Sequence, residues 1–379
     1  MKIIGIGLAA FALFAIQFLV YEKFWNRNLK VSAFFKQTGI TEGETGEIVE
    51  IIENAKWLPL PMLKVKFQTS RNLRFLDNHG SNATDQYYRN DIFHVGGKEK
   101  ITRTLKFRGE RRGYYQIKNI DMVASDLFLI GENVSHQTTD CFLYVYPKQF
   151  MCEEFRLSLQ KLNGEIQVKR HLLEDVFSYR GIREYQPYDD MRSVNWKATA
   201  RTGGLMVNQR GYSAMQTVRI FLNLEDTGIW KKEDEVEASM QIAMGLTAFF
   251  LRQGIKVSCY ANGKDIFTDA HMEIEGGAGV SQLDTIGKAF ARIDTQKGTW
   301  SFCELFQERI LAEADGSFTF FISPNGYDDF TMLLEFCGHK GLEYCWYYPV
   351  ISDSDYEINR KCKQLESDGR LVLLPCYVR

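Results

Sequence analysis

The uncharged apolar run Ile3–Tyr21 limits the fold more strongly than any other stretch of the sequence. As an α-helix rising about 1.5 Å per residue, it would span roughly 28 Å, which is close to the thickness of a hydrocarbon core. The aromatic residues Phe24 and Trp25 follow at the level of an interfacial belt. Basic residues flank the run mainly on its carboxyl-terminal side, where the sequence places Lys23, Arg27, Lys30 and Lys36. This asymmetry predicts a single-pass anchor in the cell membrane with the bulk of the chain in the cytoplasm.

Two other interpretations of this run stay open. A cleaved signal peptide would have a more basic start than Lys2 alone, and no A-x-A cleavage site precedes Glu22. A buried core helix is the second alternative, since the run offers no polar stripe of the kind found on surface helices. We favour the membrane anchor over both, because the charged and aromatic flanks fit it.

The composition limits the partners of the remaining chain. With 379 residues, 45% hydrophobic and 25% charged, the chain is expected to be globular and to form two or three domains. Its formal net charge of −2 and the absence of a long Lys/Arg run argue against nucleic acid as a partner. The eight cysteines lack C-x-x-C spacing, so they are expected to be buried thiols in a reducing compartment.

Residues 31–150 predict an antiparallel β-sandwich that follows the anchor and flank at residues 1–30. Short runs with period-two alternation, such as EIVEIIEN and LKVKFQT, are separated by Gly, Asn and Pro clusters. Several such strands at short spacing are typical of a small sandwich or barrel. The polar stretch Arg71–Gly97 shows weak patterning and predicts a long hairpin loop.

Residues 213–379 predict a different architecture, an α/β domain. The continuous apolar run in Thr217–Glu225 is typical of a central parallel strand, and the amphipathic stretch Asp234–Gln253 predicts a helix that ends at Gly254. Strand and helix patterns then alternate, which predicts a doubly wound parallel sheet. The further predicted helices are Ser281–Ile293, Phe302–Glu313, Asp328–His339 and Asp355–Glu366.

Residues 151–212 join these parts with a predicted helix and a charged segment, Phe177–Tyr212, which we call the signature segment. Its candidate functional residues are Arg180, Arg183, Glu184, Tyr185, Asp189, Asp190, Arg192, Trp196 and Arg201. Asp189 and Asp190 could work as general acid and base, but the nearby arginines would keep both acids ionised. We therefore expect an ion-paired network with Trp196 as its apolar plug, which serves structure or docking rather than catalysis.

The signature segment resembles the domain of unknown function 58 family. The matching residues are the R-E-Y triplet Arg183–Tyr185, the P-x-D-D-x-R turn Pro187–Arg192, Trp196, and the A-R-T-G run Ala200–Gly203. The stretches Gly43–Val65 and Arg111–Gly131 are similar to earlier parts of the family pattern. The resemblance implies a von Willebrand factor type A-like domain after the signature, and work with a MoxR-type AAA+ ATPase and other type A domain proteins. The family often has two transmembrane helices before its sandwich, whereas one is visible here.

The loop after the strand at Thr217–Glu225 is the expected position of a ligand site, because ligands bind at the carboxyl ends of parallel strands. The resemblance implies a D-x-S-x-S metal site for Mg²⁺ there, yet this chain has an amide and a carboxylate in the first two slots, and Ser323–Asn325 stands where a later Asp is expected. The degenerate metal ligands are Asn223, Glu225, Asp226 and Thr227. We expect a metal-free scaffold with no cofactor; the alternatives are weakly bound Mg²⁺ and a turn capped by the last two residues.

These patterns favour a membrane-anchored, non-enzymatic scaffold or adaptor that binds protein partners. No catalytic residue is assigned, because the sequence lacks G-x-S-x-G and a phosphate-binding loop, and we interpret EGGAG, Glu275–Gly279, as a flexible turn. One alternative is a Mg²⁺-dependent ligand-binding or hydrolytic protein that uses the degenerate metal ligands together with Asp189 or Asp190. A secreted adhesion module is another alternative.

Overall fold

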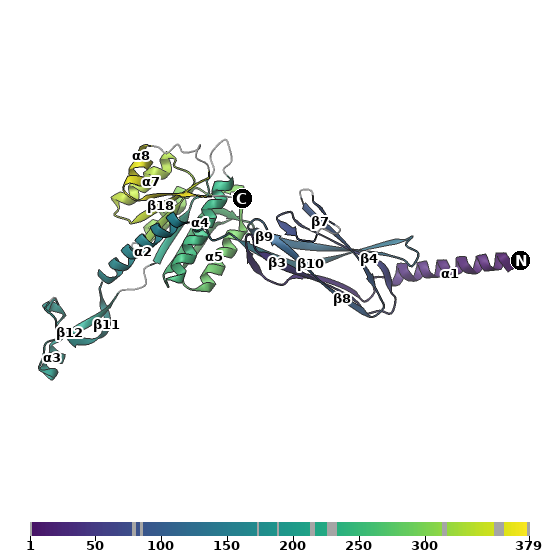
Figure 1. Cartoon of the computed structure of the whole chain (residues 1–379), viewed down its shortest axis with the longest axis horizontal. Helices are drawn as coiled ribbons and strands as arrows, with labels where there is room; N and C mark the ends of the chain where they lie inside the picture. The colour runs from purple at the N-terminus through teal and green to yellow at the C-terminus, as the bar shows by residue number, and fades with distance from the viewer. Residues whose placement is uncertain are drawn as a thin grey trace. The chain divides into compact units, whose positions relative to one another are not determined.

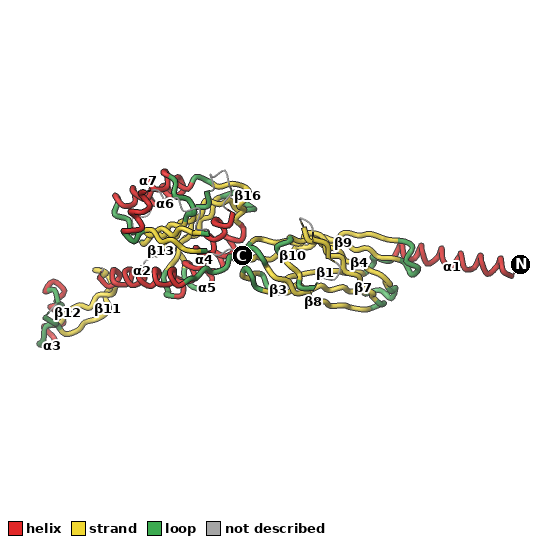
Figure 2. The backbone as a smooth tube through the Cα atoms, turned by 45° about the horizontal axis from the view of Figure 1, so that its top comes forward, coloured by secondary structure: helices red, strands yellow, loops and turns green. Residues whose placement is uncertain are grey.

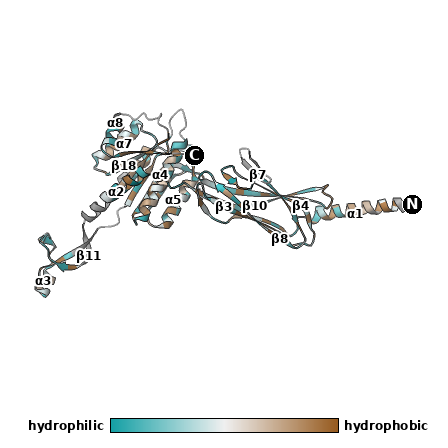
Figure 3. Ribbon diagram, viewed as in Figure 1, coloured by the Kyte–Doolittle hydropathy of each residue, from teal (hydrophilic) through white to brown (hydrophobic). Residues whose placement is uncertain are grey.

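In the computed structural model, the amino-terminal apolar run forms helix α1, Lys2–Phe24, which confirms the predicted helix and extends it past Tyr21. Within the described residues, Ile4–Phe24 is the one helix that is long and apolar enough to cross a membrane. Figure 3 shows the apolar character of this helix. The end of α1 packs against the sandwich that follows it. Tyr21 and Trp25, the latter just after the helix, are only 1% and 6% exposed and belong to the core of that sandwich.

The structure describes all residues except 1, 78–80, 84–85, 173, 188, 213–216, 226–232, 313–316, 352–359 and 377–379. The chain divides into two compact units, and Figure 1 labels their elements. The first unit contains Met1–Lys148 with Gly287–Arg292, and the second contains Gln149–Ile286 with Ile293–Arg379.

The first unit contains two β-sheets. A four-stranded sheet has the order β1-β3-β8-β5, and a six-stranded sheet has the order β2-β10-β9-β4-β7-β6 among the described residues. Nearly all pairs are antiparallel; β2 and β10 pair in parallel. The strands are β1 Leu29–Phe35, β2 Gly39–Thr41, β3 Thr45–Asn54, β4 Leu60–Ser70, β5 Leu73–Phe75, β6 Ser81–Ala83, β7 Gln86–Val95, β8 Glu99–Gly109, β9 Gly113–Ser125 and β10 Glu132–Tyr146.

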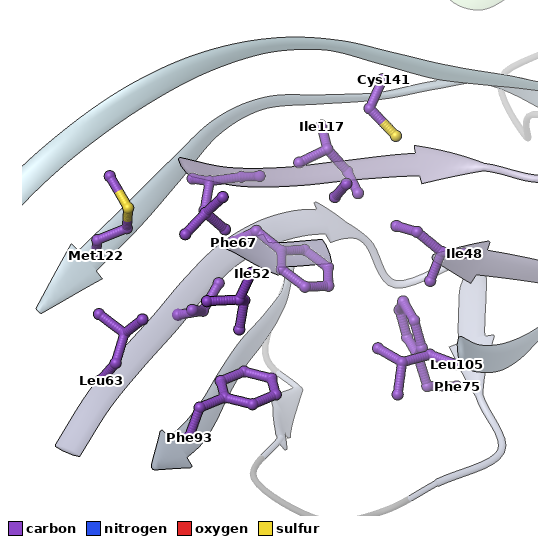
Figure 4. Packing of buried hydrophobic residues seen from close by; sticks show 14 of the residues in the cluster. Ile48, Ile52, Leu63, Phe67, Phe75, Phe93, Leu105, Ile117, Met122 and Cys141 are labelled. Carbon is purple, nitrogen blue, oxygen red and sulfur yellow. The ribbon is translucent and has the colours of Figure 1, made fainter. Parts of the chain in front are cut away.

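Alternating residues of these strands face a shared apolar core. Ile48 and Ile52 point inward from β3, and they meet Leu63 and Phe67 from β4 of the other sheet (Figure 4). All of them are at most 4% exposed. The period-two alternation in the sequence therefore reports burial on one face of each strand, as expected for two packed sheets.

The long loop predicted at Arg71–Gly97 is wrong, because this stretch contains β5, β6 and β7. The alternation was hidden by charge: Arg89 and Asp91 of β7 face inward and are only 1% and 4% exposed. Arg89 Nε lies 2.5 Å from Asp91 Oδ2, and Arg103 Nη1 lies 2.8 Å from Asp91 Oδ1. Such buried charges are tolerated only when they are paired, so this part of the core is an ion-pair cluster.

The second unit begins with α2, Glu153–Leu172, followed by the signature segment. That segment forms a two-stranded antiparallel sheet, separate from the large sheet of this unit. Its elements are β11 Glu174–Glu184, a 3₁₀ turn Met191–Ser193, α3 Trp196–Thr202 and β12 Met206–Tyr212.

A seven-stranded sheet forms the centre of the second unit among its described residues. Strands β13, β14, β17, β18 and β19 pair in parallel, whereas β15 and β16 pair antiparallel with β14. Figure 2 shows helices on both faces of this sheet. Phe221 and Phe321 face α6 and α7, while Phe320 faces Phe250 of α4 at a ring distance of 5.3 Å.

The elements are β13 Thr217–Leu222, α4 Glu233–Arg252, β14 Lys256–Asp265, β15 His271–Gly277, α5 Val280–Arg292, β16 Ile293–Thr299, α6 Phe302–Ala312, β17 Phe318–Ile322, α7 Asp328–His339, β18 Tyr344–Val350, α8 Arg360–Ser367 and β19 Leu371–Pro375.

The sequence predicted most of this unit and missed its antiparallel edge. The helix predicted at Asp328–His339 has those bounds, and the others shift by one or a few residues. The flexible turn predicted at Glu275–Gly279 is partly wrong, because Glu275–Gly277 ends β15. The helix predicted at Asp355–Glu366 lies partly outside the described residues, which resume at Arg360. The cysteines, expected to be buried thiols, form no disulfides and are mostly buried.

We predict that Glu50 makes the stability of the sandwich depend on pH. Glu50 faces the ion-pair cluster and is 2% exposed; burial, followed by the Asp91 charge, raises its pKa from 4.5 to about 7 against the opposing effect of Arg103 and Arg89. Because the folded state holds this proton more tightly than the unfolded chain, the stability that Glu50 contributes is fully present below pH 4.5 and is lost as the pH rises through about 7. A shift of this size corresponds to at most about 3 kcal/mol.

The substitution Glu50→Gln removes this titration. Relative to the original chain at the same pH, β3 and β8 peptides of the variant should gain protection from hydrogen exchange at pH 8 and gain less at pH 5. Glu53→Gln, at an exposed position of the same strand, is the matched control. An equal effect of Glu50→Gln at both pH values would contradict the prediction.

Candidate functional site

The carboxyl ends of β13 and β17 form a topological switch point. In chain order the parallel strands are arranged 2-1-3-4-5, so the connections from the neighbouring strands β13 and β17 leave in opposite directions. In open α/β sheets, ligands bind at this point, outside the carboxyl ends of the strands. The segment after β13 contains Asn223 and Glu225, and the segment after β17 contains Ser323 and Asn325.

A buried network of neutral polar side chains joins the strand ends at the switch point. Asn223 Nδ2 donates to Ser323 Oγ at 3.2 Å, and Asn223 Oδ1 accepts from Asn262 Nδ2 of β14 at 3.2 Å. Asn262 Nδ2 also donates to the Trp300 carbonyl at 3.0 Å, and Ser323 Oγ donates to the Asn325 carbonyl at 2.9 Å. The side chains of Asn223, Asn262 and Ser323 are at most 2% exposed, so they have little access to water. Their hydrogen bonds to one another take the place of hydrogen bonds to water.

Glu225 is directed away from this network to a helix end. Its Oε1 accepts from the backbone N–H of Phe302, the first residue of α6, at 2.7 Å. Its backbone carbonyl accepts from the Asn325 side chain. Because a carboxylate at a helix N-terminus interacts favourably with the unpaired N–H groups and the helix dipole, Glu225 caps α6.

The degenerate metal ligands of the sequence are only partly placed. Asn223 and Glu225 lie near the switch point, but the Asn223 amide oxygen already accepts from Asn262 and from the Glu225 backbone N–H at 2.9 Å. In the part of the chain that the structure describes, no group of three or more His, Cys, Asp or Glu residues is arranged to hold a metal ion. Asp226 and Thr227 lie outside the described residues. The metal-free scaffold therefore stays a prediction, and weakly bound Mg²⁺ stays its alternative.

A pocket of about 510 Å³ opens beside the network. Its apolar wall comes from α6 and α7 and includes Phe306, Phe330 and Leu333, which are nearly fully buried. Met332 and Phe336 also line the pocket and remain 58% and 42% exposed. The remaining lining is more polar: Asn223, Glu225, Ser301, Phe302, Cys303, Gln307, Asn325, Tyr327 and Asp329. The pocket therefore combines a large apolar wall with carboxylates.

Cys303 is the thiol in this pocket. Burial raises its pKa, and the carboxylates of Glu225, Asp329 and Glu304 raise it further. A cysteine nucleophile needs the opposite shift, because the thiolate is the reactive form. The surroundings of Cys303 therefore favour a packing role over a catalytic one.

The signature segment is organised by one bidentate ion pair. Arg183, near the end of β11, donates from Nη1 and Nη2 to the two carboxylate oxygens of Asp189, both at 2.6 Å. Asp189 Oδ2 also accepts from the Gln186 backbone N–H at 2.8 Å. The hydrogen bonds from Arg183 lower the pKa of Asp189, and so the acid is held ionised. This geometry closes the turn after β11.

Asp190 has a different role from its neighbour. It is the N-cap of the 3₁₀ turn, where its side chain accepts from the Arg192 backbone N–H at 3.0 Å. Asn195 caps α3 in the same manner by accepting from the Ala198 N–H, and it donates to Asn208 Oδ1 of β12 at 2.6 Å. Gly203 ends α3 in the left-handed region with φ of 75°, where glycine avoids the strain of a side chain. The A-R-T-G run is thus a helix end.

The predicted role of Trp196 as an apolar plug is wrong, because its side chain is 65% exposed. Trp196 is the first residue of α3. Among the side chains of this segment that the structure describes, Val194 and Val207 are the buried apolar ones, at most 6% exposed. Glu184, Arg192 and Arg201 are exposed, and Tyr185 is partly buried. The side chain of Arg180 lies outside the description. The segment therefore presents an indole and several charges on its surface.

Sequence reasoning missed Asn262 and the pocket between α6 and α7. Asn262 lies inside β14 in the run KVSCYAN, where a polar residue at the end of an apolar strand was the available signal. The pocket depends on the packing of two helices that are separated by β17, and no local pattern reports that packing.

The comparisons with known proteins concern mainly the family. A family model described as "Protein of unknown function DUF58" matches residues 181–270, which run from within β11 to just past β14 and contain most of the signature segment and Asn223. This match supports the family resemblance. Comparison with curated protein sequences gave no match.

Similarities to solved structures are weak. The CARDB domain of a Pyrococcus furiosus protein is 15% identical, covers 31% of this chain and 93% of its own, and has a TM-score of 0.20. A non-cellulosomal cohesin from Archaeoglobus fulgidus is 14% identical, covers 31% of this chain and 91% of its own, and has a TM-score of 0.22. At TM-scores this low, neither protein informs the function of this chain.

We predict that the Arg183–Asp189 pair holds the turn of the signature segment. Asp189→Asn removes the charge that Arg183 binds bidentately, so the backbone of Gln186–Asn195 should exchange hydrogen faster by a small factor at pH 7. Hydrogen-exchange mass spectrometry of the full chain measures this. Glu184→Gln, at an exposed position next to Arg183, is the matched control and should leave exchange unchanged. Equal exchange in Asp189→Asn and the original chain would refute the role of the pair.

Proposed function

We propose that the chain is a membrane-anchored, non-enzymatic scaffold or adaptor that binds protein partners at the carboxyl edge of its parallel sheet. The observation that carries this proposal is the pocket beside Asn223, where an apolar wall lies at the switch point of the sheet. Large pockets at this position are the usual ligand sites of open α/β sheets. Among its lining residues, Asn223, Glu225 and Asn325 bind one another. Cys303 is held as a thiol, so the pocket is suited to binding a side chain of a partner.

The chemistry of the pocket favours a particular kind of partner. Met332 and Phe336 expose apolar surface at its mouth, and exposed apolar patches in such positions are typical of protein-binding sites. Glu225 and Asp329 add negative charge to the lining. A partner segment that inserts an apolar or aromatic side chain, with a Lys or Arg beside it, would satisfy both features.

The family resemblance supplies the proposed partner and setting. The model match at residues 181–270 supports membership of a group whose members accompany MoxR-type AAA+ ATPases and other type A domain proteins. We therefore propose a MoxR-type ATPase as partner, in the assembly or maturation of a complex, and a type A-like identity for the α/β domain. The hydrophobic length of α1 supports single-pass anchoring, and Lys23 and Arg27 support a cytoplasmic position of the rest of the chain.

The pocket is tested by capture of the partner from intact membranes. Met332→Glu places a charge at the apolar mouth, at a position 58% exposed, where it should not disturb folding. We expect crosslinking pull-down with the full chain to capture an AAA+ ATPase, identified by mass spectrometry, and Met332→Glu to lose most of that capture.

Val280→Glu is the matched control, because Val280 is 83% exposed and does not line the pocket. It should capture the ATPase as well as the original chain does. Equal capture by both variants would remove the pocket from the proposal. Failure of the original chain to capture an AAA+ ATPase would remove the partner.

The competing function is a Mg²⁺-dependent protein that uses the degenerate metal ligands. It predicts that Mg²⁺ stabilises the folded chain, whereas the scaffold predicts no such effect. A ligand that binds the folded state at a hundred times its Kd stabilises it by about 2.7 kcal/mol. We expect millimolar Mg²⁺ at constant ionic strength to leave the thermal unfolding of the α/β domain unchanged, because Glu225 caps α6 and Asn223 is already satisfied. A rise in unfolding temperature with Mg²⁺ that Glu225→Gln abolishes would favour the metal-dependent function.

A further inference from the structure

The tip of the β9–β10 hairpin exposes a continuous group of large apolar side chains. Leu127, Phe128, Leu129 and Ile130 are 52%, 59%, 56% and 69% exposed, respectively. Contiguous exposed apolar residues mark a surface that is covered by a partner or by lipid. We call these four residues the hairpin tip.

The hairpin tip lies against the middle of α1. The Phe128 ring lies 5.6 Å from the Phe14 ring, and Gln17 Nε2 donates to Asp126 Oδ2 at 3.2 Å. At the other end of the contact, Asn26, just beyond α1, donates to Ser135 of β10 at 2.9 Å. The hairpin therefore runs alongside the second half of α1 and reaches its midpoint.

Three backbone N–H groups of the hairpin tip have partners within the protein. Asp126 Oδ1 accepts from the N–H groups of Phe128 and Ile130 at 3.2 and 3.0 Å, and the Asp126 carbonyl accepts from the Leu129 N–H at 3.1 Å. Asp126 itself is 1% exposed. In hydrocarbon, backbone donors must find partners within the protein, and this loop supplies them.

We propose that the hairpin tip enters the hydrocarbon layer of the lipid bilayer beside α1. This inference rests on the proposed anchoring by α1 and goes beyond the proposed function. The apolar helix Ile4–Phe24 has about the length of a hydrocarbon core, roughly 32 Å at 1.5 Å per residue. Phe128 of the tip contacts this helix at Phe14, and the adjacent Asp126 contacts it at Gln17. A bilayer that surrounds the exposed apolar part of the helix to beyond Phe14 therefore also surrounds the tip.

An exposed tryptophan at the same end of the sandwich fits the level of the lipid headgroups. Trp57 is 77% exposed in the loop between β3 and β4. This loop lies at the carboxyl-terminal part of α1, because Tyr21 Oη donates to the Pro59 carbonyl at 2.9 Å. Tryptophan is enriched at membrane interfaces, and Lys23 and Arg27 lie at the same helix end, where they can meet anionic headgroups.

A photo-crosslinking amino acid in the full chain tests the proposal. Benzoylphenylalanine replaces Phe128 or, as a second tip position, Ile130, in protein reconstituted into vesicles of phosphatidylcholine and phosphatidylglycerol. Phe142 is the matched control, because it is 41% exposed on β10 in the strand part remote from the tip, next to Tyr114. Phe11 of α1, 69% exposed, reports anchoring by the helix. Mass spectrometry after irradiation identifies lipid adducts.

We expect lipid adducts at positions 11, 128 and 130 and no lipid adducts at position 142. Adducts at 11 without adducts at 128 and 130 would overturn the insertion of the tip and leave anchoring intact. Absence of adducts at all four positions would overturn the anchoring as well. Adducts at 128 that join two copies of this chain instead of lipid would overturn the proposal in favour of a self-association surface.

Discussion

Asn223 holds together the ends of three parallel strands, and the shape of the candidate site depends on that. Its own strand is β13, its amide oxygen accepts from Asn262 of β14, and its amide nitrogen donates to Ser323 after β17. Buried polar groups at strand ends must find partners, because water is excluded from them. By using neutral amides and a hydroxyl for this purpose, the chain closes the edge of the sheet without bringing carboxylates together.

The same requirement explains other features of the chain. Asp126 accepts hydrogen bonds from backbone N–H groups of an exposed apolar loop. Glu225 accepts one from the backbone N–H of the first residue of α6. Inside the sandwich, Asp91 binds both Arg89 and Arg103. In these three cases a carboxylate is placed where N–H donors would otherwise be unpaired.

The sequence allowed prediction of the elements where burial follows a simple period. The helix Asp328–His339 and the strands around Phe221 and Phe321 appear as expected, because their apolar residues report burial directly. Prediction fails where polar residues face inward: the sequence predicts a loop at β7, because Arg89 and Asp91 interrupt the apolar alternation of the strand. At the candidate site, Asn223 was identified by its position after a buried strand, whereas the pocket arises from the contact between α6 and α7. Trp196 was misjudged because aromatic residues are usually buried, and its position at the start of a short exposed helix was not visible in the sequence.

The neutral edge of the sheet has a consequence for how a partner would be bound. An edge lined with several carboxylates is held apart by repulsion until a cation neutralises it, so binding there is coupled to the ion. The strand ends joined by Asn223, Asn262 and Ser323 are held by neutral hydrogen bonds, so their arrangement requires no cation. A partner at this pocket therefore meets a preorganised surface, which reduces the entropy lost on binding. In the proposed function, the hydrolysis cycle of the ATPase would supply the switching that such a surface lacks.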